Sequence, residues 1–263
     1  TILQVVEKAL GRTFALKVVK RQSVDDDIYI AQALHELEVA QQLDHRTLLK
    51  IYDGQTKRKW LRTTGVELLM EFVDGRTLDD LQSRDVGQLV LVFSQVASGL
   101  NHMHRRGVYH GDLKPANIML SRAGAVKIID FGTAWIRGQP KDRVQGTPQY
   151  MAPEQASDKV VDDRTDLYNF GATMYRLLTG EYANLGGLLP SANGALGARS
   201  KVRPPIGYNP NIPGTLNETV MACLDPDPDR RPAGAFEVKH QLKAVAKYLG
   251  LEKDDLRGSE EGD

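Results

Sequence analysis

Apolar and polar residues alternate with a two-residue period along much of the first 73 residues, and this pattern predicts strands. The predicted strands cover residues 2–7, 13–19, 48–52 and 66–72, and a turn signal at Gly11-Arg12 separates the first two. Between the second and third strands the period lengthens to that of a helix over residues 26–43. We expect four of its residues to lie near one buried face: Ile30, Leu34, Leu37 and Leu43.

Beyond residue 74 the helical period dominates. The run 74–77, Asp-Gly-Arg-Thr, breaks the pattern and predicts the point where the chain leaves its first region. A long helix is predicted over residues 87–106, and more helices are predicted over 163–179, 215–224 and 235–249. The buried stripe of the long helix should contain Leu89, Val92, Phe93, Val96 and Leu100.

Two stretches lack a regular pattern. Residues 181–214 contain several Gly, Pro and Asn residues and predict a long loop, and the charged residues 252–263 predict a frayed or disordered tail. The whole pattern predicts an α+β fold with two lobes. We expect a β-rich lobe over residues 1–73, a mostly helical lobe over 74–250 and a polar tail or linker over 251–263, with room for further domains beyond either end.

Composition narrows the class of protein. The chain has 263 residues and 41% apolar content, enough for a substantial core, and its 34 basic and 34 acidic residues balance. The balance gives no sign of a nucleic-acid or anionic-membrane partner. Cys223 is the only cysteine, which excludes an internal disulfide and fits a reducing compartment. No apolar run is long enough to span a bilayer and no signal peptide is visible, so we expect a cytoplasmic location.

The candidate chemistry lies between short apolar runs in the second lobe. Residues 110–117 read HGDLKPAN and residues 130–132 read DFG. They place two carboxylates, Asp112 and Asp130, close in sequence to the amine of Lys114 and the amide of Asn117. Phosphoryl transfer needs such a set: one carboxylate accepts the hydroxyl proton, an amide and a second carboxylate hold magnesium, and a lysine opposes the charge of the moving phosphate.

With APE at residues 152–154, these ordered motifs resemble the Ser/Thr protein kinase family, and the resemblance covers nearly the whole chain. It implies a bilobal kinase fold, ATP and Mg²⁺ as cofactors and a protein as substrate. The GTPQYMAPEQ form of residues 146–155 is closest to bacterial kinases. Such kinases are often the cytoplasmic part of larger proteins, which the polar tail suits.

The resemblance assigns residues of the first lobe to nucleotide binding. Lys17, in the run Phe-Ala-Leu-Lys-Val, is expected to contact the α- and β-phosphates. Its carboxylate partner is Glu36 or Glu38, and Glu36 is preferred because it lies nine residues before His45. Glu38 is then a solvated helix residue.

The resemblance also assigns the surroundings of the adenine. Residues 68–75 resemble the hinge between the lobes: the backbone of Glu71 and Val73 is expected to bind adenine, with Met70 at the back of the pocket. Apolar surface around the nucleotide is expected from Ile2, Ala15, Leu78 and Met119.

In the second lobe, the resemblance makes Asp112 the catalytic base, Lys114 the partner of the transferring phosphate, and Asn117 and Asp130 the metal ligands. Thr147 is expected to contact Asp112 and Lys114 as part of the peptide-positioning loop. His104 and His110 are interpreted as core histidines, His104 packing against the helix that bears Asp166. Glu154 is expected to form a buried structural pair with Arg231.

The sequence departs from the family pattern at two places. Gly111 stands where most members have an arginine that binds a phosphate on the activation loop, and residues 135–145 contain no Ser, Thr or Tyr. We therefore expect activity without phosphorylation of residues 134–145. The glycine-rich loop, counted back from Lys17, would fall just before Thr1. We expect it to precede the given chain, because residues 1–16 keep the expected hairpin length; its true absence would impair phosphate positioning.

Two other functions remain open. The spacing His-Gly-Asp with Asn117 five residues later also resembles small-molecule phosphotransferases, although Lys114, the peptide-positioning loop and APE argue against that group. A pseudokinase that binds nucleotide and acts as a scaffold or regulator is the other alternative. The intact set Lys17, Glu36, Asp112, Asn117 and Asp130 favours catalysis.

Overall fold

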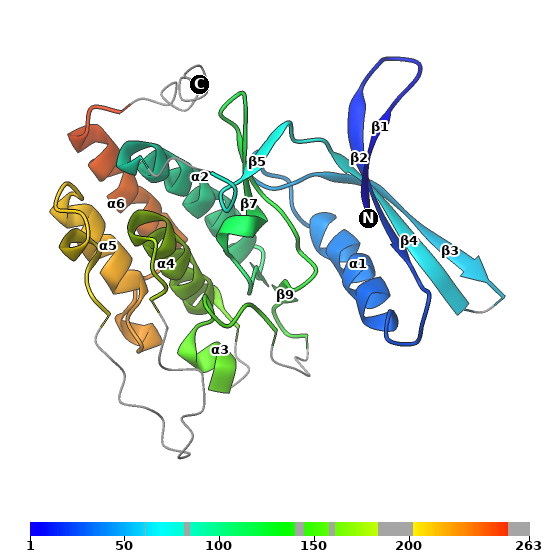
Figure 1. Cartoon of the computed structure of the whole chain (residues 1–263). Coiled ribbons are helices and arrows are strands. Elements are labelled where there is room, and N and C mark those ends of the chain that lie inside the picture. The colour runs from blue at the N-terminus through cyan, green and yellow to red at the C-terminus, as the bar shows by residue number, and fades with distance from the viewer. Residues whose placement is uncertain (61, 82–84, 140–144, 158–160, 184–201, 252–263) are drawn as a thin grey trace.

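The structure is a computed structural model that describes residues 1–60, 62–81, 85–139, 145–157, 161–183 and 202–251. Within these residues the chain forms a β-rich N-terminal lobe and a helical C-terminal lobe, side by side in Figure 1. The α+β prediction is therefore confirmed. The predicted tail and most of the predicted loop over 181–214 lie outside the described residues.

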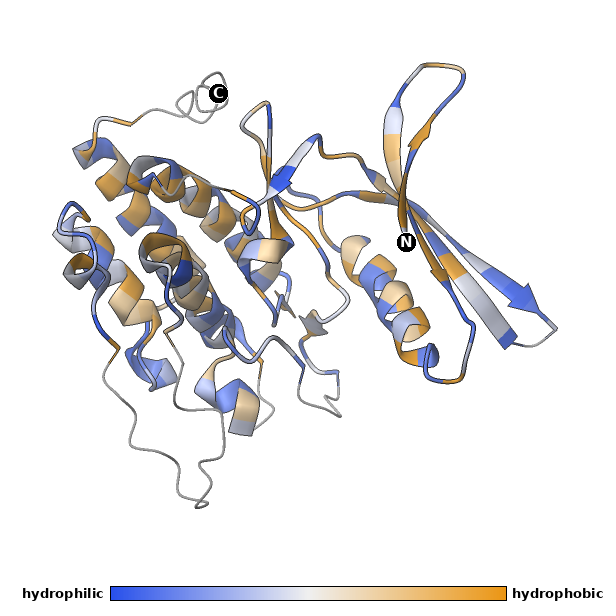
Figure 2. Ribbon diagram, in the orientation of Figure 1, coloured by the Kyte–Doolittle hydropathy of each residue, from blue (hydrophilic) through white to orange (hydrophobic). Residues whose placement is uncertain are grey.

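The N-terminal lobe is an antiparallel sheet with one helix on it. Its strands follow the order β1-β2-β4-β3. They are β1 (Ile2–Val6), β2 (Thr13–Lys20), β3 (Ile51–Lys59) and β4 (Arg62–Glu71). The four predicted strands are confirmed, but the third begins at Ile51 rather than residue 48, where Leu48 makes only an isolated bridge to Ile128. The fourth begins earlier than predicted because its outer half pairs with β3 as a long hairpin. The outer ends of β3 and β4 are largely hydrophilic in Figure 2.

The helix of this lobe, α1 (Asp27–Ala40), connects β2 to β3. It starts one residue later than predicted and ends three residues earlier. Ile30 is buried as predicted, whereas Leu34 is 38% exposed, so its assignment to the buried face was wrong. The buried positions are Ile30, Ala33, Glu36, Val39 and Ala40. A carboxylate thus occupies the middle of the buried face, where the hydrophobic pattern predicted a leucine.

The predicted chain break at residues 74–77 contains a short strand, β5 (Gly75–Thr77), which pairs with β7 of the C-terminal lobe. Gly75 is required there, because a Cβ atom would lie 2.1 Å from the carbonyl oxygen of Leu120. The chain therefore joins the C-terminal sheet at once after it leaves β4. The small sheets of this lobe have the orders β5-β7-β8 and β6-β9. Their remaining strands are β6 (Val108–Tyr109), β7 (Ile118–Ser121), β8 (Val126–Ile128) and β9 (Trp135–Ile136).

Helices build the rest of the C-terminal lobe; α3 was not predicted, and the other four agree with the predicted ranges to within two residues at each end. They are α2 (Val86–His104), α3 (Pro153–Ser157), α4 (Asp163–Thr179), α5 (Gly214–Cys223) and α6 (Ala235–Tyr248). Short 3₁₀ turns lie at Pro115–Asn117, Pro205–Gly207 and Pro228–Arg230. None of the helices in the described ranges is both long and apolar enough to cross a membrane.

The central helices α2 and α4 are set by their sequences. The Asp85 carboxylate caps α2 by accepting from the Gln88 backbone N–H at 2.7 Å, and Asp162 caps α4 in the same way. The predicted α2 stripe, Leu89 to Leu100, is wholly buried, and Phe93 meets Phe170 of α4 edge to face. This apolar helix is visible in Figure 2. It forms a rigid base from which the chain leads into the HGDLKPAN segment.

Candidate active site

Strand and helix geometry bring Lys17 and Glu36 together between β2 and α1. The Lys17 Nζ donates to Glu36 Oε2 at 2.6 Å, and the Glu36 side chain is only 2% exposed. Glu38 instead lies 54% exposed beside His35. The preference for Glu36 over Glu38 as the partner of Lys17 is therefore confirmed, while the role of the pair stays a prediction.

Burial shapes the charge of this pair. Removal from water raises the pKa of Glu36, and the nearby carboxylate of Asp130 raises it further. The attraction and hydrogen bond of Lys17 lower the pKa but do not outweigh burial. The Lys17–Glu36 contact therefore holds a carboxylate whose charge is costly in this position.

The predicted hinge follows directly from β4. Strand register places Ala15 opposite Met70, and both side chains are buried. The Val73 backbone forms no hydrogen bond to the backbone of any described residue, which leaves its N–H and C=O available to a ligand. Met119 pairs across the next sheet with Thr77, just after the hinge. Ile2 pairs with Lys17 and is 66% exposed.

Asp112 and Lys114 form a closed triangle with Thr147. The Lys114 Nζ donates to Asp112 Oδ2 at 2.8 Å and to Thr147 Oγ1 at 2.7 Å. The Thr147 backbone N–H donates to Asp112 Oδ1 at 2.7 Å. The predicted contacts of Thr147 are confirmed. A segment 35 residues downstream of Asp112 is thereby held against the candidate base and lysine.

The two candidate metal ligands present oxygen atoms. The Asn117 Nδ2 donates to the Asp112 backbone oxygen at 2.9 Å, so its amide is oriented with the side-chain oxygen at the free end. Asp130 is exposed, and its Oδ1 accepts from the Gly132 backbone N–H at 3.3 Å. Carboxylate and amide oxygens are the donors that Mg²⁺ prefers. The donor set thus fits the metal that the sequence predicted.

Asp130 has a left-handed backbone, with φ of +65°. Non-glycine residues seldom adopt this conformation, and it persists only where the surroundings impose it. The next residue, Phe131, is fully buried and meets the ring of His110 at 6.2 Å. Anchoring of Phe131 in the core therefore fixes the direction of the Asp130 carboxylate.

Asp166 of α4 binds the first residues of the HGDLKPAN segment. It accepts from the His104 ring and from the backbone N–H groups of His110 and Gly111, each at 2.8 Å. Burial opposes ionisation of Asp166, but these bonds outweigh it and hold its pKa below the ordinary value. The interpretation of His104 and His110 as packed histidines is confirmed by their contacts. The orienting role of Asp166 was missed, because its partners are mainly backbone groups.

Gln155 is a second residue that the sequence did not reveal. Its side chain is fully buried, and its Nε2 donates to the Gly111 oxygen at 2.6 Å and to the Gln145 oxygen at 2.8 Å. Its Oε1 accepts from the Ala152 backbone N–H at 3.3 Å. Gln155 thus ties the residue before Asp112 to both ends of the segment that carries Thr147. A glutamine after APE is the only signal that the sequence offered.

Gly111 is suited to this connection. Its φ is +71°, and a Cβ atom would lie 3.3 Å from the carbonyl oxygen of Thr133. Glycine adopts this conformation without the steric cost that a side chain adds. The position that usually carries arginine therefore contributes only its backbone, through Asp166 and Gln155.

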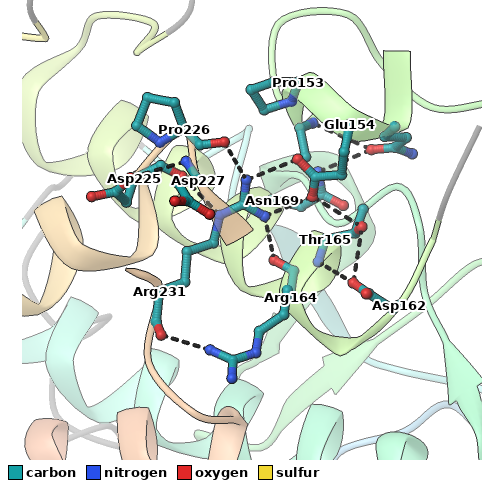
Figure 3. Close-up of polar contacts among 12 residues, drawn as sticks. Pro153, Glu154, Asp162, Arg164, Thr165, Asn169, Asp225, Pro226, Asp227 and Arg231 are labelled. Carbon is teal, nitrogen blue, oxygen red and sulfur yellow. Dashed lines mark hydrogen bonds and ion pairs between the residues drawn. The ribbon is translucent and has the colours of Figure 1, made fainter. Parts of the chain in front are cut away.

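The predicted Glu154–Arg231 pair lies away from this set, where α3 meets the turn before α6. The Arg231 guanidinium contacts Glu154 with two parallel bonds, at 2.6 and 2.8 Å. It also donates to the backbone oxygens of Asp225, at 2.8 Å, and Arg164, at 2.7 Å (Figure 3). Its side chain is fully buried. This part of the prediction is confirmed as a structural contact.

Cys223 is excluded as a nucleophile. It is fully buried on α5, and burial raises the pKa of its thiol to about 12. A thiol must ionise to attack a substrate. Cys223 therefore offers no thiolate to a substrate.

Comparison with known proteins agrees with this geometry. Residues 1–242 match the family described as "Protein kinase domain". The chain is 32% identical to a probable serine/threonine-protein kinase PknB of Bifidobacterium longum. The matched region covers 90% of this chain and 36% of that protein. It is 33% identical to the serine/threonine-protein kinase pkn3 of Myxococcus xanthus, covering 91% of this chain and 46% of the relative. For PknB of Mycolicibacterium smegmatis the identity is 32%, over 90% of this chain and 39% of the relative.

This chain thus spans less than half the length of these curated relatives. The match nevertheless includes both lobes and every candidate site residue. The chain belongs to the protein kinase domain family.

Proposed function

We propose that the chain is a Ser/Thr protein kinase that transfers the γ-phosphoryl group of ATP, with Mg²⁺, to a hydroxyl of a protein substrate. One observation carries the proposal: the triangle of Asp112, Lys114 and Thr147. It joins the candidate base and lysine to the segment before APE, with all three contacts between 2.7 and 2.8 Å. A peptide bound along that segment has its hydroxyl placed beside Asp112. A small-molecule acceptor needs no such segment.

The roles follow from position. Asp112 orients the acceptor hydroxyl and takes its proton late in the transfer; a carboxylate has enough lone pairs to do so while it accepts from Lys114 and Thr147. Lys114 opposes the charge of the transferring group. Lys17, held by Glu36, binds the α- and β-phosphates. The backbone of Glu71 and Val73 binds adenine between Ala15, Met70 and Met119, and Ile2 covers the nucleotide.

Asn117 and Asp130 would hold Mg²⁺, which would neutralise negative charge on the phosphates. The residues of this chain provide the positioning: the buried Phe131 fixes Asp130, and the bond to the Asp112 backbone fixes Asn117. We place the lobe boundary after Val73, with residues 74–250 as the second lobe.

We further propose that the kinase is active without a phosphate on residues 134–145. In relatives that need a phosphate on the activation loop, an arginine before the catalytic aspartate binds that phosphate. Here Gly111 has no side chain, and Gln155 joins Gly111 to Gln145 and Ala152 with direct hydrogen bonds. The segment is thus tied to the catalytic residues by an uncharged side chain already present in the chain.

The test is incorporation of radiolabel from γ-labelled ATP into a generic basic protein, with Mg²⁺, by protein shown by mass spectrometry to be free of phosphate at the start. Labelled Ser or Thr is expected, with loss of about 100-fold or more in Asp112→Asn. Nucleotide binding without incorporation would contradict the proposal and indicate a scaffold. Labelling of an amino sugar or alcohol alone would indicate a small-molecule phosphotransferase. Activity that starts only after modification of residues 134–145 would refute the phosphate-independent part alone.

A further inference from the structure

A basic groove of about 440 Å³ lies between α2 and α6, on helices that pack together in Figure 1. Four cations line it: Arg46, Lys239, Lys243 and Lys247. None of the eleven lining residues is acidic. The chain as a whole has zero formal net charge, so this grouping is a local feature and not a reflection of composition. We define these residues and the surface between them as the basic groove.

Helix stability does not account for the cations of α6. Lys239, Lys243 and Lys247 are spaced by four residues, so they form one row on the helix, and like charges at this spacing destabilise a helix. A cation in the last turn is favoured by the helix dipole, which explains Lys247 but not the other two. The row is therefore costly unless a negative group binds to it.

Three of the four groove cations, all except Lys239, lack a negative partner among the described residues. Neither Arg46, Lys243 nor Lys247 forms an ion pair with a carboxylate of the described residues. Lys239 donates to the Ser98 hydroxyl at 3.0 Å, which fixes one end of the row against α2. All three of Arg46, Lys243 and Lys247 are exposed. The groove thus presents cations to a ligand from outside.

The base of the groove is apolar. Leu91 of α2 and Ala246 of α6 line it, and both are 8% exposed. A ligand that fits the groove would place an apolar side chain on this base and negative charges beside the exposed cations. An acidic peptide segment has this chemistry. A nucleic-acid backbone or a membrane surface is better matched by a broad basic face, which the balanced charge of this chain does not suggest.

We propose that the basic groove docks an acidic, leucine-containing segment of a protein substrate. The inference deepens the proposed function and rests on it for the identity of the partner. Docking away from Asp112 would raise the local concentration of substrate at the active site, and would lower KM without changing kcat.

Binding is tested on the full chain by fluorescence anisotropy, using a fluorescein-labelled peptide of glutamates around one leucine. A peptide with glutamine at every glutamate is the probe control. We expect the acidic peptide to bind the wild type and to bind Lys243→Glu/Lys247→Glu at least about tenfold more weakly. Added salt should weaken binding, because exposed charges more than about 10 Å apart are largely screened at 0.1 M. The matched control is Arg58→Glu/Lys59→Glu, at the exposed end of β3, which should bind like wild type.

Lys243→Gln/Lys247→Gln provides a milder variant, expected to give a smaller loss, and thermal unfolding checks that each variant is folded. In turnover assays, an acidic segment added to a substrate should lower KM for the wild type but not for the charge-reversed variant. Equal affinity of both proteins for the peptide would overturn the proposal. Failure of the full chain to bind the peptide would also overturn the proposal, even if the cause were its own acidic residues 252–263 covering the groove. Binding of an oligonucleotide of the same charge as tightly as the acidic peptide, or more tightly, would overturn it as well. Peptide binding needs no turnover, so its failure leaves the proposed kinase activity untouched.

Discussion

Two carboxylate–cation pairs in the described residues, Glu154–Arg231 and Glu36–Lys17, differ in construction. Glu154 receives two parallel bonds from Arg231, whose guanidinium also donates to three backbone oxygens, so every part of the pair is satisfied (Figure 3). Glu36 receives one bond from Lys17, whose side chain is 26% exposed, and one from the Phe131 backbone N–H. The first pair joins two parts of the helical lobe, and the second joins a strand to a helix beside the proposed nucleotide site.

The pKa directions express the same difference. Burial opposes ionisation in both cases. For Glu154 the hydrogen bonds of Arg231 and Thr165 outweigh burial, and the pKa lies below its ordinary value. For Glu36 burial prevails over Lys17, and the pKa is raised. We conclude that the Glu154–Arg231 pair contributes to folding, whereas ionisation of Glu36 opposes folding; the nucleotide-binding role proposed above for Lys17 would account for that cost.

The largest expected effect comes from Arg231→Met. It leaves the Glu154 carboxylate buried without its cation, and removal of one partner of a buried pair costs about 3–5 kcal/mol of unfolding free energy. Urea unfolding followed by circular dichroism measures this loss. Arg230→Met is the matched control, because Arg230 is 73% exposed and should change stability by no more than about 0.5 kcal/mol. Equal losses of unfolding free energy in the two variants would show that the Arg231–Glu154 pair contributes no more than an exposed arginine.

Lys17→Met should act on activity instead. We expect kcat/KM for phosphorylation to fall about 100-fold or more, because a charge aimed at the nucleotide phosphates is lost. The unfolding midpoint should stay close to that of wild type, since Glu36 can accept a proton when its partner is removed. Lys20→Met, an exposed change on the same strand, should alter neither quantity. A large fall in stability with Lys17→Met would show that this pair, too, holds the fold.

Gln155→Leu should have an intermediate effect on turnover. It removes the bonds to Gly111 and Gln145, and misplacement of the segment that carries Thr147 should reduce kcat by about 10- to 100-fold. Nucleotide affinity should not change, because Gln155 contacts none of the proposed nucleotide ligands. Titration of the variant with a fluorescent ATP analogue distinguishes this positioning role from general unfolding. Loss of nucleotide binding would contradict the assignment.

The smallest effect is a pH dependence of opposite sign for the two carboxylates. The folded pKa of Glu154 is lowered, so its contribution is present above the unfolded value and disappears as the pH falls through the folded pKa. The cost of Glu154→Gln should therefore shrink at acidic pH. The folded pKa of Glu36 is raised, so wild type loses stability as the pH rises from the unfolded value to the folded one. Glu36→Gln should gain relative stability over that range, as measured by urea unfolding.

Much of the site could be predicted from the sequence because its contacts join short motifs with fixed spacing. Strand alternation places Ala15 and Lys17 on one face of β2, and the position of Glu36 before His45 selected it from two candidates. The hydrophobic pattern failed at α1 for a related reason. Glu36 occupies a position on the buried face of α1. The leucines therefore predicted a buried face that is rotated about the helix axis from the observed one, and Leu34 is exposed.

Other contacts could not be predicted, because one partner is backbone from a distant segment. Gln155 binds the carbonyl of Gly111, 44 residues away, and any residue can supply a carbonyl. Strand β5 likewise forms only because β7 offers its edge to Gly75–Thr77. Such contacts depend on how the elements are placed in space, and no local pattern in the sequence records them.

The central claim is that one buried pair serves catalysis and the other serves the fold. The most direct test is to measure the unfolding temperature and the turnover per folded molecule of Glu36→Gln and Glu154→Gln side by side at neutral pH. We predict that Glu36→Gln unfolds at or above the wild-type temperature with strongly reduced turnover. Glu154→Gln should unfold at a lower temperature with turnover per folded molecule close to wild type. If both variants lose stability and turnover together, the division between the two pairs is wrong.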